Sequence, residues 1–366
     1  MKVLLINTVP LEANGISTFI INSAEVMSKK GVNVTITAPN KVNSKLKDKL
    51  RKKGISIVEI MNRMRNPIRY FIELKKLLAQ YNYDVVHVNG NSTTMAIELL
   101  AAKQESIKLR IAHSHNTTTE HPFVNRILRP VFEKNINGRL ACNDAAGKWL
   151  FKNKKYTVIK NGIFLNKYTF NTSTRKSIRE KYKISDDEIL IGHVGMFNYQ
   201  KNQKFLVNLL KKMDPKYKLM LIGTGPDLKI IKEYAEKKSI SNRIIFTGSI
   251  NNVPDYLNAF DLFTLPSNFE GQPFVVIEAM ASGLPLVVST NVSREINLND
   301  KVNFISLDKD KEWKNIIERY KFDSTTRLMN SVNSIKILKK MGYDVEWNVY
   351  NSLIPLYKEL MEKSNK

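Results

Sequence analysis

The strongest constraint on the fold is that short, almost wholly apolar runs alternate with helical patterns along the chain. Runs such as KVLLINTV (2–9) contain few of the polar positions that a strand with one wet face needs. Strands that are apolar on both faces are typical of parallel sheets covered by helices, so the pattern predicts a doubly wound α/β fold. We expect strands at 2–9, 32–39, 55–60, 84–90, 109–115, 139–143 and 157–162, and at 189–196, 218–225, 243–249, 262–267, 284–290 and 302–306.

The number of strands indicates two domains, because thirteen exceed what one open sheet usually holds. The segment 161–185 is polar and basic and contains no apolar run, which predicts a hinge near 163–185. We therefore expect an N-terminal Rossmann-like domain at 1–165 and a C-terminal one at 166–343. The amphipathic segment 344–366 has no strand after it, and we expect it to pack back on the N-terminal domain. Two such domains would face each other across a cleft, where ligands bind at the carboxyl ends of the strands.

The composition is that of a globular protein. Of the 366 residues, 43% are hydrophobic and 25% are charged, and no apolar run reaches the 18 residues of a candidate transmembrane helix. The apolar run near the N-terminus is too short for a signal peptide, so a first strand is expected there. A single cysteine, Cys142, excludes an internal disulfide and suits a reducing cytoplasm.

The net charge of +24 is concentrated in the first half of the chain. Residues 1–165 hold 27 Lys and Arg against 11 Asp and Glu, a net charge of +16. The excess is densest in KVNSKLKDKLRKKG (41–54), which has seven basic residues and one acidic residue. Such a field attracts nucleic acid, anionic membrane or phosphorylated substrates. A solvated lysine-rich face is the alternative, and charge alone does not choose among these.

Two glutamates interrupt one of the most apolar stretches, PSNFEGQPFVVIEAMASGLPLVVST at 266–290. Pro273 suits the first position of a helix and Gly283 suits its left-handed C-terminal cap, which predicts a short helix between them. That helix is apolar on nearly every side except at Glu278, and such a helix is buried. A buried carboxylate needs a partner, so Glu278 either caps or pairs with a nearby Lys or Arg, or it binds a ligand.

The other glutamate, Glu270, lies in the loop before this helix, at the carboxyl end of the preceding strand. Backbone N–H groups at 271–275 lie between the two glutamates, and a helix N-terminus favours an anion. Carboxylates accept hydrogen bonds from hydroxyl groups. A ligand with both sugar hydroxyls and phosphates would fit these groups.

The spacing of Glu270 and Glu278 resembles the Glu-x7-Glu signature of retaining glycosyltransferases of the GT-B fold, family 4, often called group 1. The resemblance is good over residues 189–295 and weaker but continuous over 1–165. It implies two Rossmann-like domains. The stretches that carry it are IAHSHNT (111–117), VIKNGIFLNKY (158–168), HVGMFNYQKNQKFLV (193–207), LMLIGTGPDLKIIKEYAEK (219–237), RIIFTGSINNVPDYLNAFDLFTLPSNFEGQP (243–273) and the region of Gly15.

The resemblance also implies roles for single residues. Lys201 would meet the diphosphate of a nucleotide sugar, Glu278 the ribose hydroxyls and Glu270 the sugar hydroxyls, with the base over 247–251. The implied catalytic residues are His115, Glu270 and Lys201. The implied donor-binding residues are Gly15, Gly195, Met196, Lys201, Asn202, Gly223, Ile250, Glu270, Gly271, Phe274, Val275 and Glu278.

Two positions depart from the family pattern. Met196 stands where the family has an arginine beside the diphosphate, so one positive charge is missing. A charged hydrogen bond contributes roughly 1.5–3 kcal/mol, and donor affinity or rate would suffer unless a cation such as Arg294 or Lys160 substitutes. Asn14 replaces the first of two glycines in the first strand–helix turn, while Gly15 keeps the second.

Two histidines end the buried strand in RIAHSHNT (110–117), and alternation along a strand makes His113 and His115 point the same way. By resemblance, His115 is the active-site histidine near the transferred sugar. A metal-binding pair and a satisfied core histidine are the alternatives. The sequence offers no obvious third ligand, and the family needs no metal or other cofactor. The Asp-x-Asp within 307–311 is flanked by lysines, which predicts a surface turn.

The function implied is transfer of a hexose or N-acetylhexosamine from a nucleotide sugar, with UDP preferred, to a saccharide acceptor with retention of configuration. The basic segments 41–54 and 125–134 favour docking on the anionic inner face of the cell membrane. The acceptor would then be lipid-linked, in exopolysaccharide, capsule or glycolipid synthesis, and the enzyme cytoplasmic and peripheral.

Three alternatives to this function stay open. One is a GT-B relative of different chemistry, such as a nucleotide-sugar epimerase. Another is a weakened or inactive transferase, because of Met196. The last is a basic module that binds nucleic acid or membrane; no helix-turn-helix, zinc or RNP-type signal is present, so we expect no nucleic-acid partner.

Overall fold

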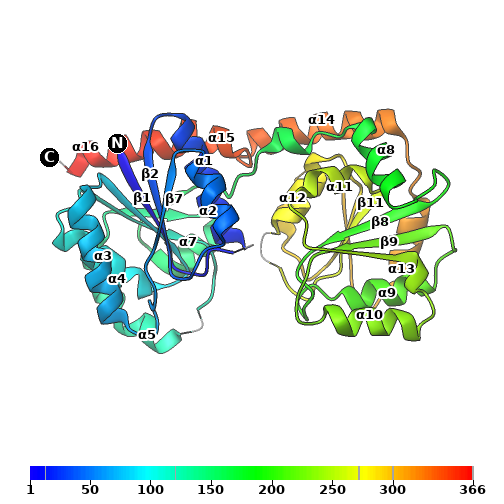
Figure 1. The fold of residues 1–366 in the computed structure, drawn as a ribbon, viewed down its shortest axis with the longest axis horizontal. Helices are drawn as coiled ribbons and strands as arrows, with labels where there is room; N and C mark the ends of the chain where they lie inside the picture. Colours follow the sequence, from blue (N-terminus) through cyan, green and yellow to red (C-terminus); the bar gives the residue numbers. More distant parts are fainter. Residues whose placement is uncertain (13, 120, 271–272, 299–300, 365–366) are drawn as a thin grey trace. The chain divides into compact units, whose positions relative to one another are not determined.

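The computed structural model describes residues 1–12, 14–119, 121–270, 273–298 and 301–364 (Figure 1). The chain forms two compact units. Unit 1 comprises Met1–Phe164 and Gly342–Lys366, and unit 2 comprises Leu165–Met341. The chain therefore leaves unit 1, forms all of unit 2 and returns to unit 1 with its last residues.

Unit 1 is built on a seven-stranded sheet with the strand order β3-β2-β1-β4-β5-β6-β7, and every pairing is parallel. Its strands are β1 (Lys2–Asn7), β2 (Asn33–Ala38), β3 (Ile55–Glu59), β4 (Val85–Gly90), β5 (Leu109–Ser114), β6 (Gly138–Ala141) and β7 (Thr157–Val158). Its helices are α1 (Gly15–Lys29), α2 (Ser44–Arg51), α3 (Pro67–Tyr81), α4 (Ala96–Gln104), α5 (Pro122–Ile127), α6 (Arg129–Asn135), α7 (Asp144–Phe151), α15 (Val345–Asn348) and α16 (Ile354–Ser364), with a 3-10 turn η1 (Thr93–Met95) and a π-helical stretch η5 (Val349–Leu353).

Helices cover both faces of this sheet, as the apolar runs predict. Side chains of β1 alternate between two cores: Val3 and Leu5 belong to one, Leu4 and Ile6 to the other. The first core includes α1 and the C-terminal segment, whose Leu353 is fully buried there. The returning segment thus forms part of one layer of unit 1.

Unit 2 is built on a six-stranded parallel sheet with the order β10-β9-β8-β11-β12-β13. Its strands are β8 (Ile189–Val194), β9 (Tyr217–Ile222), β10 (Ile244–Gly248), β11 (Leu262–Leu265), β12 (Leu286–Ser289) and β13 (Val302–Ile305). Its helices are α8 (Thr172–Lys181), α9 (Gln203–Lys211), α10 (Leu228–Lys237), α11 (Val253–Ala259), α12 (Phe274–Ala281), α13 (Asp310–Arg319) and α14 (Ser324–Lys340), with 3-10 turns η2 (Leu165–Tyr168), η3 (Ser241–Arg243) and η4 (Arg294–Ile296).

The predicted strands and the α/β class are confirmed: each of the thirteen apolar runs overlaps one observed strand. The helix of the Glu-x7-Glu segment begins one residue later than expected. Pro273 is its N-cap, with extended backbone at ψ 113°, and the first helical residue is Phe274. Gly283 ends the segment with φ +70°, as the cap pattern predicts, and a Cβ there would lie 2.5 Å from the Arg327 carbonyl oxygen.

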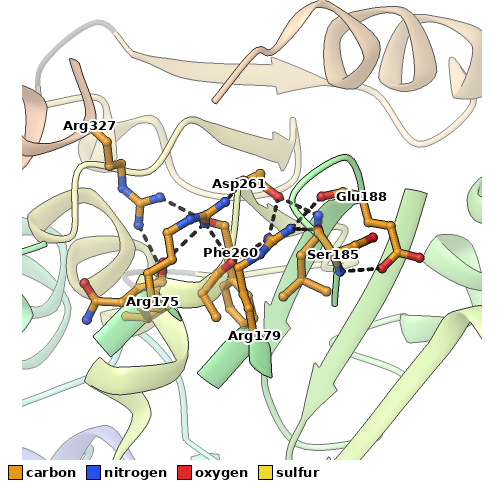
Figure 2. Close-up of polar contacts among 11 residues, drawn as sticks. Arg175, Arg179, Ser185, Glu188, Phe260, Asp261 and Arg327 are labelled. Atoms are coloured by element: carbon orange, nitrogen blue, oxygen red, sulfur yellow. Dashed lines mark hydrogen bonds and ion pairs between the residues drawn. The ribbon is translucent and has the colours of Figure 1, made fainter. Parts of the chain in front are cut away.

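The polar segment 161–185 is more than a hinge, because it contains α8, which is held to unit 2 by buried arginines (Figure 2). Arg175 and Arg179 bond opposite oxygens of Asp261, at 2.6 and 3.1 Å. Arg327, from α14, donates to the carbonyl oxygens of Leu257 and Phe260 at 2.9 and 2.8 Å. One carboxylate and the carbonyl end of α11 thus satisfy three cations, since a helix C-terminus favours positive charge.

Burial disfavours the charged form of these arginines, and it is the largest influence on the pKa of Arg175 and of Arg327. It lowers the pKa of Arg175 and lowers that of Arg327 to about 9. Arg327 therefore remains protonated at pH 7. The opposing attraction comes from Asp261, which raises the pKa of both side chains. Asp261 is accordingly the anion on which the network depends.

Replacing Asp261 with Asn is expected to lower the free energy of unfolding of unit 2 by about 3–5 kcal/mol, because it leaves buried arginines without their carboxylate. Urea unfolding followed by the fluorescence of buried Trp313, with Trp149 and Trp347 changed to Phe, measures this. Asp310→Asn, which removes the surface pair with Lys212, is the control and should change stability little. Equal losses in the two variants would contradict the prediction.

Candidate functional site

The residues that the sequence assigns to a donor site in unit 2 follow the carboxyl ends of neighbouring strands. Gly195 and Lys201 follow β8, Gly223 follows β9, and Glu270 follows β11. In the sheet order, β8 lies between β9 and β11. Parallel strands bring these loops to one edge, the usual ligand edge of an α/β sheet. Ile250 follows β10, the strand beyond β9, and is partly buried.

Close backbone packing fixes the loop after β8. A Cβ on Gly223 would lie 2.1 Å from the Gly195 carbonyl oxygen, and Gly223 has φ +138°, so only glycine fits. A Cβ on Gly195 would lie 3.1 Å from two carbons of the Lys201 side chain. The aliphatic part of Lys201 therefore lies across Gly195. Asn202 is the N-cap of α9 and has a left-handed backbone at φ 51°, and its side chain donates to the Pro266 carbonyl oxygen at 3.2 Å.

Lys201 and Glu270 form an ion pair between Nζ and Oε1. Their side chains are 16% and 10% exposed, so the pair is largely shielded from water. Ser267 Oγ donates to the same carboxylate oxygen at 3.2 Å, and the Glu270 backbone is bonded to Asn291 and Ser293. The two residues that the resemblance assigns to different parts of a donor are thus in contact, and each satisfies the other's charge.

Glu278 has a hydroxyl partner instead of the Lys or Arg considered above. Tyr168 Oη donates to Glu278 Oε1 at 2.9 Å, and Tyr168 lies in η2. Within the described residues Glu278 has no ion-pair partner. Burial raises its pKa to about 6, while the Tyr168 hydrogen bond opposes this rise. Burial, with the adjacent Glu278 carboxylate, also raises the pKa of Tyr168, so its hydroxyl stays protonated and can only donate.

The remaining predicted residues of unit 2 lie around this edge. Phe274 and Val275 form the first turn of α12, whose N-cap has no side-chain hydrogen bond. The first N–H groups of the helix therefore have no capping side chain. Met196 is 54% exposed, and Arg294, considered above as its substitute, stacks on the Phe304 ring at 4.3 Å. Gly271 lies outside the described residues.

In unit 1, Gly15 is the first residue of α1 and Asn14 is its N-cap. Asn14 Oδ1 accepts the Ser17 N–H at 2.9 Å, so the residue that replaces the family's first glycine satisfies the helix start. Lys160, the other candidate substitute for the missing arginine, also belongs to unit 1, where its ammonium lies 4.9 Å from the centre of the Tyr343 ring.

His115 follows β5 and is partly exposed, and its ring lies 4.1 Å from that of His113, so the two point the same way as predicted. Its Nε2 lies 3.0 Å from Asn89 Oδ1. Burial lowers the pKa of His115 to about 3, and the Asn161 side chain opposes this only in part. His113 is itself bonded to His87, through His113 Nδ1 and His87 Nε2 at 3.2 Å. The sequence pattern missed Asn89, His87 and Tyr168, although the motif VIKNGIFLNKY ends at Tyr168.

No group of three or more His, Cys, Asp or Glu side chains among the described residues could hold a metal ion. Three of the four histidines of unit 1, His87, His113 and His115, pack ring against ring. No helix in the same ranges is long and apolar enough to cross a bilayer.

Comparison with known proteins identifies the family. Residues 13–167 match the model of Glycosyltransferase Family 4, and residues 174–327 match that of Glycosyl transferases group 1. The chain belongs to the family 4, group 1 glycosyltransferases. The family resemblance that the matching stretches of the sequence indicate is therefore confirmed.

Relatives and solved structures agree with this assignment. The chain is 28% identical to the glycosyltransferase EpsF of Bacillus subtilis over 318 residues, 82% of this chain and 81% of that protein. It is 25% identical to a UDP-Gal:alpha-D-GlcNAc-diphosphoundecaprenol alpha-1,3-galactosyltransferase of Escherichia coli over 300 residues, 75% and 77% of the two chains.

A crystal structure of Anabaena HepE in complex with UDP and glucose is similar to this structure, with a TM-score of 0.79. The two sequences are 18% identical, and the alignment covers 98% of this chain and 100% of that chain. Because the sequence identity is low, this similarity establishes the fold alone. The predicted two-domain α/β GT-B fold is confirmed.

Replacing Tyr168 with Phe should shift the pH dependence of nucleotide binding. If ionised Glu278 binds the ribose, affinity falls as pH drops through about 6, the pKa of Glu278. Loss of the hydroxyl removes the bond that lowers this pKa, so the midpoint moves to higher pH and affinity at pH 7 falls. Calorimetric titration of UDP between pH 5 and 8 measures this.

Tyr320→Phe is the matched control for this substitution. It also removes a tyrosine hydroxyl from unit 2, one that bonds Asn303 at 2.8 Å and not Glu278. The control should keep the midpoint of the wild-type chain. An unchanged midpoint in Tyr168→Phe would show that this hydroxyl does not set the ionisation of Glu278.

Proposed function

We propose that this glycosyltransferase moves a hexose or N-acetylhexosamine from a UDP-sugar to a lipid-linked saccharide, with retention of configuration and without a metal ion. The observation that carries the proposal is the contact between Lys201 and Glu270 at the strand edge of unit 2. It brings together the cation suited to a diphosphate and the carboxylate suited to sugar hydroxyls. Glu278, bonded to a hydroxyl already, is suited to accept one from a ribose.

The proposed step breaks the bond between the anomeric carbon and the diphosphate oxygen and forms a bond from that carbon to an acceptor hydroxyl oxygen. The hydroxyl proton passes to the leaving phosphate on the same face of the sugar, which gives retention. Negative charge then grows on the diphosphate. Lys201 and the uncapped N–H groups of the first turn of α12 are suited to stabilise it. Glu270, released from Lys201, would hold the sugar hydroxyls.

The names of similar proteins support this choice of substrates. The Escherichia coli relative is named for a UDP-galactose donor and an acceptor linked to diphosphoundecaprenol. The structure of HepE contains UDP and glucose. We extend both features to this chain as part of the proposal, since the donor nucleotide rests on no single residue of it.

Nucleotide binding in EDTA tests the donor half of the proposal. UDP should bind better than GDP or ADP, and Glu278→Ala should abolish binding. Lys201→Ala should weaken it about 10- to 100-fold, the loss of one charged hydrogen bond. Isothermal titration calorimetry measures these affinities.

Two further variants sharpen the calorimetric test. Lys204→Ala is the matched control and should bind like the wild-type chain, because the Lys204 ammonium of α9 lies over the ring of Tyr234 in α10. Met196→Arg, which restores the family's cation, should strengthen binding. Absence of binding by every nucleotide, in wild type and in Met196→Arg, would overturn the proposed donor site.

The proposed lipid-linked acceptor gives the surface of unit 1 a role. In α2, Lys45 and Lys49 are exposed, whereas Lys47 pairs with Glu59. Lys53, which follows α2, pairs with Glu25. Part of the basic excess of 41–54 is therefore neutralised within unit 1. The exposed lysines remain available to an anionic surface.

Exposed apolar side chains on unit 1 favour a membrane over a dissolved polyanion. On α5, Phe123 and Ile127 are 74% and 57% exposed. Near the start of α3, Met64 and Ile68 are 52% and 74% exposed. Both segments are held at η1, because Asn125 bonds Thr93 and Arg63 bonds Thr94. We propose that these side chains enter the bilayer interface while the lysines meet lipid headgroups.

Flotation with vesicles of phosphatidylglycerol and phosphatidylcholine tests membrane docking. The double variant Phe123→Ser, Ile127→Ser and the double variant Lys45→Glu, Lys49→Glu should each lower the bound fraction severalfold. Ile230→Ser, which removes a 61% exposed apolar side chain from unit 2, is the control. Binding of wild-type protein that does not exceed that of the double variants would refute this surface.

A further inference from the structure

The amide of Asn89 at the end of β4 is held in one orientation. Its Nδ2 donates to the carbonyl oxygens of Ile6 and His87, at 3.4 and 3.2 Å. Its Oδ1 faces His115 Nε2 at 3.0 Å. Reversing the amide would place Oδ1 against two carbonyl oxygens and lose both hydrogen bonds. Asn89 is almost wholly buried, at 0% exposure, so water does not compensate such a reversal.

This orientation decides the tautomer of His115. An amide oxygen only accepts, so His115 Nε2 must carry the proton that lies between it and Asn89 Oδ1. A neutral imidazole has one N–H and one acceptor nitrogen, which leaves Nδ1 as the acceptor. The ring is neutral at pH 7, because burial lowers its pKa to about 3.

The acceptor nitrogen has no partner within the described chain. His115 Nδ1 and Asn161 Oδ1 are both covered and both lack a hydrogen bond, although the two side chains lie close enough for Asn161 to influence the pKa of His115. With Nε2 protonated, both atoms are acceptors. A ligand hydroxyl is suited to donate a hydrogen bond to either of these two atoms.

The titratable groups next to His115 are linked to one another by hydrogen bonds. Tyr357 Oη bonds His87 Nδ1 at 2.5 Å, and His87 Nε2 bonds His113 Nδ1 at 3.2 Å. Burial lowers the pKa of His87 to about 3 and that of His113 well below its usual value, so both are neutral. Phe19 from α1 packs against the His113 and His115 rings. These described neighbours of His115 are therefore uncharged at pH 7.

We infer that Asn89 is a positioning residue that holds His115 in its Nε2–H form, so that Nδ1 accepts a hydrogen bond from a sugar hydroxyl. The inference rests on the proposed function for the identity of the ligand, but the tautomer itself belongs to the chain alone. Asn89 acts through His115 and contacts no substrate. Its place two residues after His87 on β4, paired in register with His113 on β5, puts it beside His115.

Long-range proton–nitrogen correlation spectra of protein labelled with 15N-histidine test the tautomer directly, with His115→Gln to assign the signals. In wild type, His115 should show a protonated Nε2 and an unprotonated Nδ1. Asn89→Asp should raise the pKa of His115, because a carboxylate stabilises the imidazolium. Asn89→Leu should abolish the preference for Nε2–H. Protonation of Nδ1 in wild type, or an unchanged tautomer in Asn89→Leu, would overturn the inference.

A matched control separates positioning from loss of stability. Asn135→Leu also removes a buried amide from unit 1, one that bonds the Val131 carbonyl oxygen, and it should leave the His115 signals unchanged. In transfer assays, Asn89→Asp should move the acidic limb of the rate profile to higher pH. Asn89→Leu should lower kcat about tenfold and leave the affinity for UDP unchanged, since its contacts lie in unit 1.

Failure of this inference is distinguishable from failure of the proposed function. If UDP binds as proposed but His115 is protonated at Nδ1, only the inferred role of Asn89 is refuted. If UDP does not bind while the spectra show Nε2–H in wild type and its loss in Asn89→Leu, the donor assignment falls. The structural statement about His115 then stands.

Discussion

The candidate donor site depends on one close contact between two strand ends. The backbone of Gly223, after β9, packs against the carbonyl group of Gly195, after β8, with no room for a Cβ between them. This contact holds the loop on which Lys201 lies, and Lys201 in turn meets Glu270 from the loop after β11. A side chain at Gly223 would separate the two strand ends and remove the support of the ion pair. The positions of Lys201 and Glu270 therefore depend on glycine at position 223.

The carboxylates of the signature are already satisfied before any ligand arrives. Glu270 accepts from Lys201 and Ser267, and Glu278 accepts from Tyr168. A donor must therefore replace these partners with hydroxyls and phosphates of at least equal strength. This requirement makes the site selective. A ligand that supplies hydroxyls without phosphates, or phosphates without hydroxyls, leaves a buried ion or carboxylate unsatisfied.

The sequence was sufficient for elements whose pattern is local. All strands could be predicted, because parallel strands buried on both faces are apolar without interruption. The Glu-x7-Glu spacing, together with the other matching stretches over 1–165 and 189–295, was enough to indicate the family. The buried role of Arg175 could not be predicted, because an arginine on a polar segment looks solvated until Asp261 and the carbonyl end of α11 are placed beside it. Asn89 was missed for the same reason: its partner is brought near by strand pairing and not by spacing.

The discontinuous course of unit 1 has a consequence for synthesis on the ribosome. The strands of unit 1 emerge first, but one layer of its core includes Leu353 and Tyr357, which emerge after all of unit 2. Until then this apolar face of the sheet is covered only in part, by α1 and α2, and His87 lacks the hydroxyl of Tyr357. Unit 2 is continuous in sequence and can complete its fold before the C-terminal segment of unit 1 has been synthesised. Unit 1 is thus synthesised first but completes its fold last. During this interval a chaperone would have to protect the exposed apolar face of unit 1.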